Sequence, residues 1–456
     1  MATAATAAPA RVASWNIGEK GLAALAAATP GGLGALFEGQ LSRPDIVCLQ
    51  ETKLSGPDKL TSELANVPGY TSYFAFCRAA TGGSLVRASY AGTATYVRHG
   101  VPTLGACGAL GEPLRSAAAQ HCEPESERLD TELLTLAEAG DVDSEGRALL
   151  TDHGAFVLLN LYCPASGREV ERKGYKRRFH EAVSVRCANL RQRGRQVLVV
   201  GDLNVAPLAL DVHRGMHEGG GPPRRRPEPQ AAEAEEEEDP WDKKHWFREQ
   251  LGAGFVDCFR LHHPTRTNAF TFWPVVSRAR ETNTGARLDH ILASEEAGGG
   301  GLAKAATRCD ISPEVMGSDH CPIWVELSLP LLRSEQQGKR APPPLATLPP
   351  LCTSHLKRLR SSQQGLGSYL TAAAPATEAA APAESGARKR EATAAPQGGR
   401  RKQARQQGPQ TIDAFFSKRS SGNDPAAAAV SMGGSAQGNG AFGSEAAALR
   451  EAIARS

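Results

Sequence analysis

The sequence has few cysteines and no long apolar run. Its ten cysteines are spread over 456 residues and none forms a Cys-x-x-Cys pair. This argues against a disulfide framework or a zinc site and fits a reducing compartment. No stretch approaches the roughly 18 apolar residues that a membrane-spanning helix needs. The first ten residues, MATAATAAPA, lack the charged and apolar regions of a secretory signal. We therefore expect no membrane partner.

A net positive charge is lacking in most of the chain and is found only towards its C-terminal end. Residues 1–330 carry 35 Lys+Arg against 41 Asp+Glu, net −6, whereas residues 331–456 carry 17 against 8, net +9. Six of the acids lie in one run, 233–239. This split argues against a uniformly basic, histone-like protein and places cationic attraction in the tail.

Short β-rich runs alternate with helical stretches up to about residue 330. Runs rich in Val, Ile, Leu and aromatics predict strands at 11–17, 45–51, 93–99, 155–164, 196–205, 287–294 and 322–329. Several are continuously apolar, as is typical of strands that are covered on both faces. Residues 20–41 and 175–194 are expected to be helical. This pattern predicts one large α/β sandwich domain.

Three segments lack the apolar residues that a packed core requires. Residues 1–10 are expected to be a flexible N-terminus, and residues 219–240 a disordered insert within the 11–330 domain. Residues 331–456 are dominated by Ala, Pro, Gly, Gln and Ser. Such a composition cannot bury enough apolar surface to offset the entropy of ordering, so we expect a disordered basic tail.

Polar side chains cluster where the predicted strands end or begin. They are Asn16, Gln50, Glu51, Tyr162, Asp202, Asn204, Asp289, Ser318, Asp319 and His320. Any one of them alone is most simply a turn or cap residue. Several clusters at like ends of buried strands instead predict convergence on one crevice, where such folds bind ligands.

These residue types suit metal-assisted hydrolysis of phosphate esters. Mg²⁺ prefers oxygen ligands with one or two carboxylates, and Glu51 offers one. Asp202 could orient or deprotonate a water that Asn204 helps to hold. His320 could offset charge on a phosphorane-like state, and a carboxylate behind it would keep it protonated.

Six motifs occur in a specific order: SWN, LQET, LYCP, GDLN, RLDH and GSDH. Over residues 11–328 this set resembles the exonuclease III branch of the endonuclease/exonuclease/phosphatase superfamily. The stretches DSEGRALLT (143–151), AFTFW (269–273) and PEVMGSDHCP (313–322) are similar to its AP endonuclease 2 group. The resemblance implies a DNase I-like, four-layered αββα sandwich that cleaves phosphodiesters with Mg²⁺, Mn²⁺ being an alternative.

The resemblance also implies a role for each site residue. The expected catalytic residues are Tyr162, Asp202, Asn204, Asp289 and His320. The expected metal site comprises Asn16, Glu51, Asp202, Asn204, Asp319 and His320. Phe272 is expected to contact DNA by lining the pocket for an abasic sugar. The implied substrates are DNA with abasic sites or blocked 3′ ends.

Three positions depart from the family pattern. Gly18 stands where the family usually has Asp or Asn, and neighbouring Glu19 could compensate. Ala286 stands where Trp is frequent, and Ala165 where Asn often follows the tyrosine motif. We expect these departures to reduce incision at internal abasic sites relative to the trimming of 3′ ends.

Two stretches of the tail resemble boxes that bind the PCNA sliding clamp. Such a box projects an aliphatic and two aromatic side chains from one helical turn into an apolar pocket. The first has the expected spacing but ends in Leu370; the second has the stronger aromatic pair but a misplaced glutamine. Their anchor residues are Gln363, Leu366 and Tyr369, and Ile412, Phe415 and Phe416.

Basic clusters at 388–390 and 400–405 lie between these boxes. They resemble a bipartite nuclear localisation signal, so we expect a nuclear protein; the alternative is a solvated basic tail that contacts phosphates. No cysteine follows Cys352, so the family's Cys-ligated zinc finger is not expected in this tail.

The sequence therefore predicts a Mg²⁺-dependent DNA repair nuclease tethered to the sliding clamp. Two alternatives remain. The wider superfamily includes inositol-lipid phosphatases, sphingomyelinases and RNA deadenylases, and Gly18 and Ala286 would also fit a catalytically weakened, clamp-bound adaptor. We expect a monomer, because nothing in the sequence indicates a coiled coil.

Overall fold

The computed structural model describes residues 9–78, 90–116, 142–165, 170–216, 243–275, 278–296, 300–329 and 342–359. The acidic insert, both clamp-like boxes and the two basic clusters of the tail lie outside these residues. Within the described part of the chain, no helix combines the length and apolar character needed to cross a membrane.

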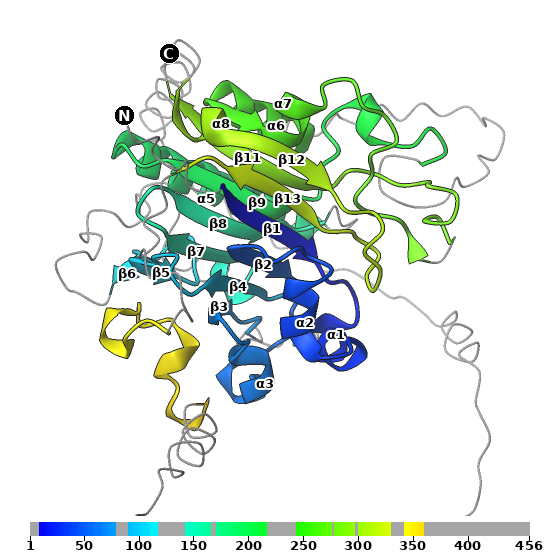
Figure 1. Ribbon diagram of the computed structural model, residues 1–456. Coiled ribbons are helices and arrows are strands. Elements are labelled where there is room, and N and C mark those ends of the chain that lie inside the picture. Colours follow the sequence, from blue (N-terminus) through cyan, green and yellow to red (C-terminus); the bar gives the residue numbers. More distant parts are fainter. Residues whose placement is uncertain are drawn as a thin grey trace, which may run out of the picture. The chain divides into compact units, whose positions relative to one another are not determined.

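Two β-sheets form the centre of the fold (Figure 1). The first has the order β12 (Ala306–Ile311), β13 (Ile323–Leu327), β1 (Ala10–Asn16), β2 (Ile46–Gln50), β4 (Thr93–Arg98) and β3 (Tyr70–Ala75). The second has the order β10 (Phe255–Asp257), β11 (Asp289–Glu296), β9 (Val197–Asp202), β8 (Val157–Tyr162), β7 (Ala148–Asp152), β5 (Gly105–Cys107) and β6 (Arg115–Ser116). Strands β1 and β2 are parallel, as are β8 and β9; the other named pairs are antiparallel.

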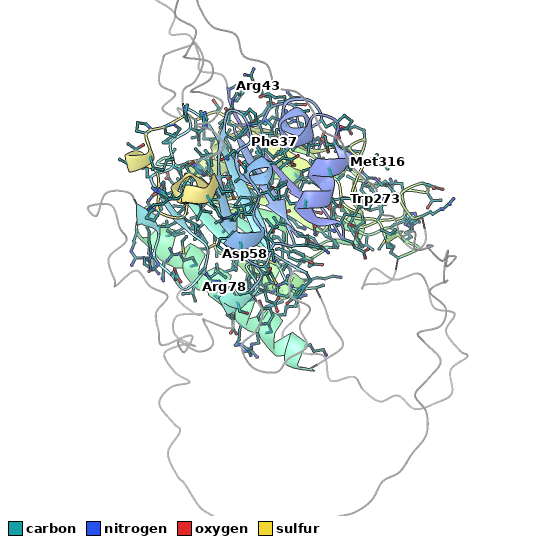
Figure 2. All side chains as sticks on the ribbon, turned by 90° about the horizontal axis from the view of Figure 1, so that it is seen from below. Phe37, Arg43, Asp58, Arg78, Trp273 and Met316 are labelled. Atoms are coloured by element: carbon teal, nitrogen blue, oxygen red, sulfur yellow. The ribbon has the colours of Figure 1, made fainter. Side chains whose placement is uncertain are left out.

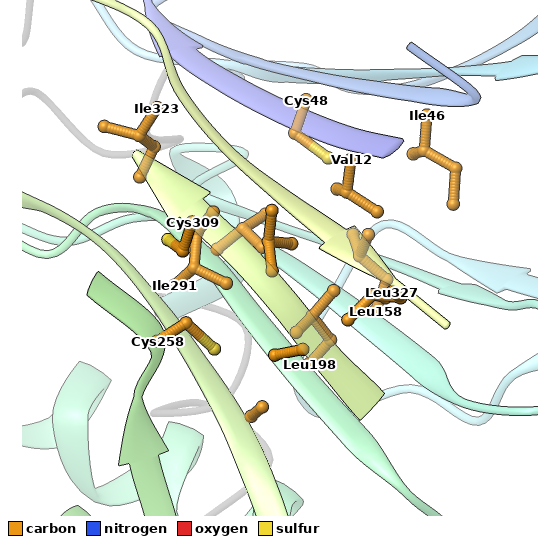
Figure 3. Packing of buried hydrophobic residues seen from close by; sticks show 14 of the residues in the cluster. Val12, Ile46, Cys48, Leu158, Leu198, Cys258, Ile291, Cys309, Ile323 and Leu327 are labelled. Carbon is orange, nitrogen blue, oxygen red and sulfur yellow. The ribbon is translucent and has the colours of Figure 1, made fainter. Parts of the chain in front are cut away.

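The central strands are apolar throughout because both of their faces are covered. In β2, Ile46 and Cys48 belong to the core between the sheets, whereas Val47 and Leu49 face the helices. The period-2 alternation of a strand produces this division. Figure 3 shows residues of the inter-sheet core, with Leu158 and Leu198 contributed by the second sheet.

Helices cover the outer faces of both sheets. Helices α1 (Gly21–Ala28), α2 (Gly32–Glu38) and α3 (Ser62–Ala65) pack on the first sheet. Helices α5 (Val170–Gln192) and α6 (Lys243–Gly252) pack on the second. The shorter α7 (Cys258–His262) and α8 (Gly301–Ala305) add Cys258 and Leu302 to the inter-sheet core. The predicted four-layered αββα sandwich is confirmed.

The helical stretch expected over 20–41 is two helices instead of one. The chain breaks between Thr29 and Gly31, where Pro30 intervenes and Gly31 has a φ of +82°. A left-handed residue cannot continue an α-helix, and glycine adopts that conformation without the usual steric cost. All seven expected strands are present, whereas β3, β7 and the short edge strands were not expected.

Residues 342–359, here called the C-terminal strap, correct the expectation of a tail without structure from residue 331. Leu348, Cys352 and Leu359 are 5%, 1% and 3% exposed. Thr353 Oγ1 lies 2.7 Å from Ser72 Oγ of β3, and Arg358 donates to the Leu60 carbonyl at 2.8 Å. The prediction failed here because prolines and alanines masked a few apolar residues that dock on an existing core.

Candidate active site

Strand pairing brings the predicted site residues to one edge of the two sheets. Asn16 pairs with Gln50 at the ends of parallel β1 and β2. Tyr162 pairs with Asp202 at the ends of parallel β8 and β9, and Asp202 also pairs with Asp289 at the start of antiparallel β11. Parallel strands end at a common edge, and an antiparallel neighbour begins there. Residues far apart in the sequence are thereby assembled.

The amide of Asn16 joins carboxylates from the two sheets. Its side chain is fully buried, and Nδ2 donates to Glu51 Oε1 at 3.1 Å and to Asp202 Oδ2 at 2.9 Å. Its Oδ1 accepts the backbone N–H of Gly18 at 3.0 Å. In this arrangement Asn16 holds two acidic groups together, a positioning role beside the metal-binding role that the resemblance implies.

Asp202 is a buried carboxyl that is prepared to accept a proton. The backbone N–H of Asn204 donates to its Oδ1 at 2.9 Å, and the Asn204 amide donates to its Oδ2 at 3.1 Å. Burial raises the pKa of Asp202 to about 7; His320 opposes this rise and Asp289 adds to it. A pKa near the working pH suits a general base.

Asn204 owes this position to an unusual backbone conformation. Its φ is +54° directly after β9, and Asn is among the residues that tolerate the left-handed region. Its amide also donates to the Cys163 carbonyl at 2.9 Å, which fixes the side chain between two strand ends.

His320 and Asp289 form a close ion pair. Nδ1 of His320 lies 2.7 Å from Asp289 Oδ2, and Nε2 lies 3.9 Å from Asp202 Oδ2. Burial lowers the pKa of His320, but the Asp289 carboxylate raises it by a larger amount, so that the pKa is about 10. The imidazole is therefore a cation at neutral pH. Asp289 Oδ1 is buried and has no hydrogen-bond partner among the described residues.

Glu51 and Tyr162 complete the polar wall of the site. Glu51 follows β2 with a φ of +59°, a strained conformation of the kind that clusters at functional sites. Its Oε2 lies 3.2 Å from Lys53 Nζ. Tyr162 lies near Glu51, and burial together with the Glu51 charge raises the pKa of its hydroxyl.

Gly18 has a packing reason that the sequence did not reveal. Its φ is +71°, and a Cβ at this position would lie 2.6 Å from Asp319 Oδ1 and 2.8 Å from Ser318 Oγ. The Asp319 carboxylate thus occupies the space that a side chain at position 18 would need. Glu19, considered as a compensating residue, is exposed.

An arginine holds the loop that carries Asp319 and His320. Arg280 donates to the carbonyls of Val315 at 2.7 Å and Ser318 at 2.8 Å. Its guanidinium lies 4.6 Å from the ring centroid of Trp273, which Figure 2 labels together with Met316 of the same loop. Sequence reasoning missed Arg280, since no motif contains it.

Phe272 lies beside the catalytic histidine candidate. The Phe272 and His320 rings are 4.9 Å apart between centroids, and the two residues form an isolated β-bridge. Ala286 is 5% exposed, bridges to Phe272 and packs with Met216. The small side chain at position 286 is thus accommodated within this apolar cluster.

The donor set fits a divalent cation. Glu51, Asp319 and the amide of Asn16 offer the hard oxygens that such ions prefer. Asp202, Asp289 and His320 form a second group whose ligand atoms all lie within 4.8 Å of one another. The unpaired Asp289 oxygen and the raised pKa of Asp202 indicate negative charge that the protein leaves uncompensated.

The sequence matches the Endonuclease/Exonuclease/phosphatase family over residues 13–320, a span that contains every site residue described above. The chain belongs to this family. Its relatives among curated proteins include DNA-(apurinic or apyrimidinic site) endonuclease 2 from Xenopus laevis, 33% identical over 341 residues, with 72% of this chain and 60% of the relative covered. The protein of the same name from Homo sapiens is 31% identical over 379 residues, with 77% and 64% covered.

The chain thus spans 60% and 64% of the length of these two curated relatives. Among solved structures, the Xenopus laevis APE2 catalytic domain superposes with a TM-score of 0.54 at 30% identity, covering 78% of this chain and 99% of that one. The AP endonuclease of Leishmania major gives 0.52 at 26% identity, covering 71% and 89%. These relatives place the chain in the AP endonuclease 2 branch of the family, as the motifs predicted.

Proposed function

We propose that this chain is a Mg²⁺-dependent DNA repair nuclease that hydrolyses phosphodiesters at abasic sites and 3′ ends. It would act as an AP endonuclease, a 3′-phosphodiesterase and a 3′–5′ exonuclease in base excision repair. The observation that carries the proposal is the buried group of Asp202, Asp289 and His320 at one sheet edge, beside Asn16 and Glu51. The names of the two endonuclease relatives support DNA as the substrate.

Asp202 and Asn204 would activate the attacking water. The water oxygen attacks phosphorus, its proton passes to the Asp202 carboxylate, and the bond to the leaving 3′ oxygen breaks. The pKa of Asp202, about 7, lets a useful fraction of the carboxyl accept that proton at neutral pH. Asn204 would hold the water in line through an amide that Cys163 also fixes.

His320 and Tyr162 would stabilise the transferring phosphate. His320 is held as a cation by Asp289, and its Nε2–H is free of that ion pair to donate to a phosphate oxygen. A fixed positive group in a buried site stabilises developing anionic charge strongly. Because its pKa is raised, the Tyr162 hydroxyl keeps its proton and can donate it in a hydrogen bond to another phosphate oxygen.

Glu51, Asp319 and Asn16 would hold the metal, with Asn204 as a further ligand, and Mn²⁺ would suit the same donors. His320, expected among the ligands, would instead serve the phosphate, because a protonated imidazole has no lone pair to offer a metal. When bound, the ion supplies a Lewis acid for the phosphoryl oxygen. Phe272 would bound the sugar pocket from the side of His320. With Ala286 beside it and Gly18 in place of an acid, we expect 3′-end trimming to exceed internal incision.

The tail would direct the enzyme to its compartment and attach it to a partner on DNA. Its basic clusters would direct it to the nucleus, and the boxes around Leu366 and Phe415 would bind the PCNA sliding clamp. The charge of the tail, net +9 over residues 331–456, supports contacts with nucleic acid as well. A monomer suffices for both functions.

One assay tests the enzymatic proposal. Wild-type protein, Asp202→Ala and the control Asp58→Ala are compared with Mg²⁺ on an internal abasic duplex and on a 3′-blocked recessed end. The Asp58 side chain is 71% exposed and pairs with its neighbour Lys59. Asp202→Ala should lose about 10²–10⁴-fold in rate, and the control should match wild type. Failure of the wild-type protein to cut either DNA would leave the phosphatase and adaptor alternatives.

A further inference from the structure

The stretch Asp143–Thr151 has no part in the reaction described so far, although it is one of the recognisable motifs. Its first half is anchored to neighbouring segments. The Asp143 carboxylate accepts the N–H groups of Leu110 at 2.7 Å and Gly111 at 3.1 Å. Gly146 has a φ of +61°, and a Cβ there would lie 2.5 Å from the Phe76 carbonyl. This turn is therefore fixed against the end of β3.

The turn delivers Arg147 to the strand that carries Tyr162. Arg147 is 3% exposed. Its Nη1 donates to the Tyr162 carbonyl at 3.0 Å, and the Tyr162 N–H donates back to the Arg147 carbonyl at 2.8 Å. Its Nε donates to Glu145 Oε2 at 2.5 Å. The guanidinium is thus held between an acid of its own turn and the backbone of β8.

The side chain of Arg147 then covers the Tyr162 ring. The guanidinium carbon lies 4.4 Å from the Tyr162 ring centroid and 5.5 Å from that of Tyr90. A guanidinium over an aromatic face gains cation–π attraction, more so when it is desolvated. One face of the Tyr162 ring is therefore fixed by a charged plane, on a side chain that lies near Glu51.

We propose that Arg147 is a positioning residue for the reaction: it holds the Tyr162 ring so that the hydroxyl is aimed at the phosphate beside Glu51. This role rests on the proposed nuclease function. It explains why the DSEGR turn is built as it is: Glu145 holds the guanidinium, and Asp143 and Gly146 fix the turn that carries it.

A double-mutant cycle tests this role in the full-length protein. The variants are Arg147→Met, Arg147→Lys, Tyr162→Phe and the combination of Arg147→Met with Tyr162→Phe. Arg11→Met is the matched control, because its guanidinium lies 3.9 Å over the Trp324 ring and pairs with Glu326, away from the site. The thermal unfolding midpoint of each variant is measured, and kcat and KM are determined on whichever of the two DNA substrates the wild-type protein cuts faster.

We expect Arg147→Met to lower kcat by about 10- to 100-fold, the cost of a misplaced catalytic group, with KM nearly unchanged. In the Tyr162→Phe background the same change should lower kcat by less than about twofold, because the hydroxyl to be aimed is gone. Arg147→Lys, which keeps the charge but not the planar fork, should recover part of kcat. Arg11→Met should match wild type.

Other results would overturn the role. If the double variant loses kcat by the product of the two single-variant losses, or if Arg147→Met keeps the wild-type kcat, Arg147 does not act through Tyr162. If Arg147→Met fails to fold, Arg147→Lys takes its place in the cycle, and collapse of both variants would assign Arg147 to folding alone. A wild-type chain that cuts neither DNA would instead remove the proposed function, and this role with it.

Discussion

Two buried ionic clusters adjoin the same four residues, 287–290. The site cluster comprises Asn16, Glu51, Asp202, Asp289 and His320. The support cluster comprises Asp211, Asp257, Arg260, Arg287 and His290. Arg287 and Asp289 are two positions apart, yet Arg287 donates to Asp211 at 2.7 Å and to Asp257 at 2.8 Å, whereas Asp289 pairs with His320.

The two clusters differ in how completely their charges are matched. In the support cluster, burial raises the pKa values of Asp211 and Asp257. The opposite effect of Arg287 and its neighbours is larger, so both pKa values lie below the ordinary value. In the site cluster burial prevails, so the pKa of Asp202 rises to about 7, and Asp289 keeps an unpaired oxygen. Complete ion pairing supports the fold, whereas incomplete pairing leaves charged groups that can bind a cation and a phosphate.

The largest expected effect is on the support cluster. Arg287→Met should lower the free energy of unfolding by about 3–5 kcal/mol, because it removes the cation that two buried carboxylates share and leaves Asp211 with Arg260 alone. Urea unfolding measures this, with Arg308→Met as control, since the Arg308 side chain is 68% exposed. A loss similar to that of the control would mean that the support cluster contributes no stability through its pairing.

The site cluster should respond in the opposite way. Asp202→Asn keeps the shape of the side chain but removes the proton acceptor, so we expect about 10²–10³-fold slower cutting. The free energy of unfolding should stay the same or rise, since a costly buried carboxylate is gone. Initial rates and urea unfolding of the same preparations provide both values. A clear loss of stability would show that Asp202 is structural as well.

Sequence reasoning recovered most of the site because strand ends are readable. The motifs GDLN, RLDH and GSDH each place a polar residue at the boundary of an apolar strand, and strand pairing does the rest, as Asp202 and Asp289 show. The support cluster was missed. Arg287 lies within a recognised motif, but its partners Asp211, in a single 3-10 turn, and Asp257, at the end of the short strand β10, belong to no recognised motif.

Other features depend on contacts that a sequence does not display. Gly18 appeared as a missing ligand, whereas its lack of a side chain makes room for Asp319. The C-terminal strap was hidden by composition, whereas the helix break falls at Pro30 and Gly31, a turn signal that the sequence does carry. The clamp-like boxes around Leu366 and Phe415 lie outside the described residues and stay predictions.

Acidity should separate the two clusters. The folded pKa of Asp202, about 7, lies above its unfolded value near 3.8. The stability that protonated Asp202 contributes is therefore fully present below pH 3.8 and is lost as the pH rises towards 7. Without divalent ions, the advantage of Asp202→Asn over wild type in unfolding free energy should grow by on the order of 4 kcal/mol across that range. Asp257, whose pKa is lowered, should show the reverse: the advantage of wild type over Asp257→Asn should shrink as pH falls below 3.8. Equal pH slopes for wild type and Asp202→Asn would contradict this assignment.

The smallest effect is expected at the joint between the clusters. Thr271 is fully buried, and its Oγ1 accepts the backbone N–H groups of Leu288 at 3.0 Å and Asp289 at 3.1 Å. Thr271→Val preserves the volume but removes this acceptor, so we expect a loss of about 1 kcal/mol in unfolding free energy. Because Asp289 would then be held less firmly while Arg287 keeps its partners, kcat should fall a few-fold. Thr307→Val, at an exposed threonine that donates to the Glu326 carbonyl, is the control for stability and rate. A loss of stability with unchanged kcat would show that the support cluster alone fixes the 287–290 segment.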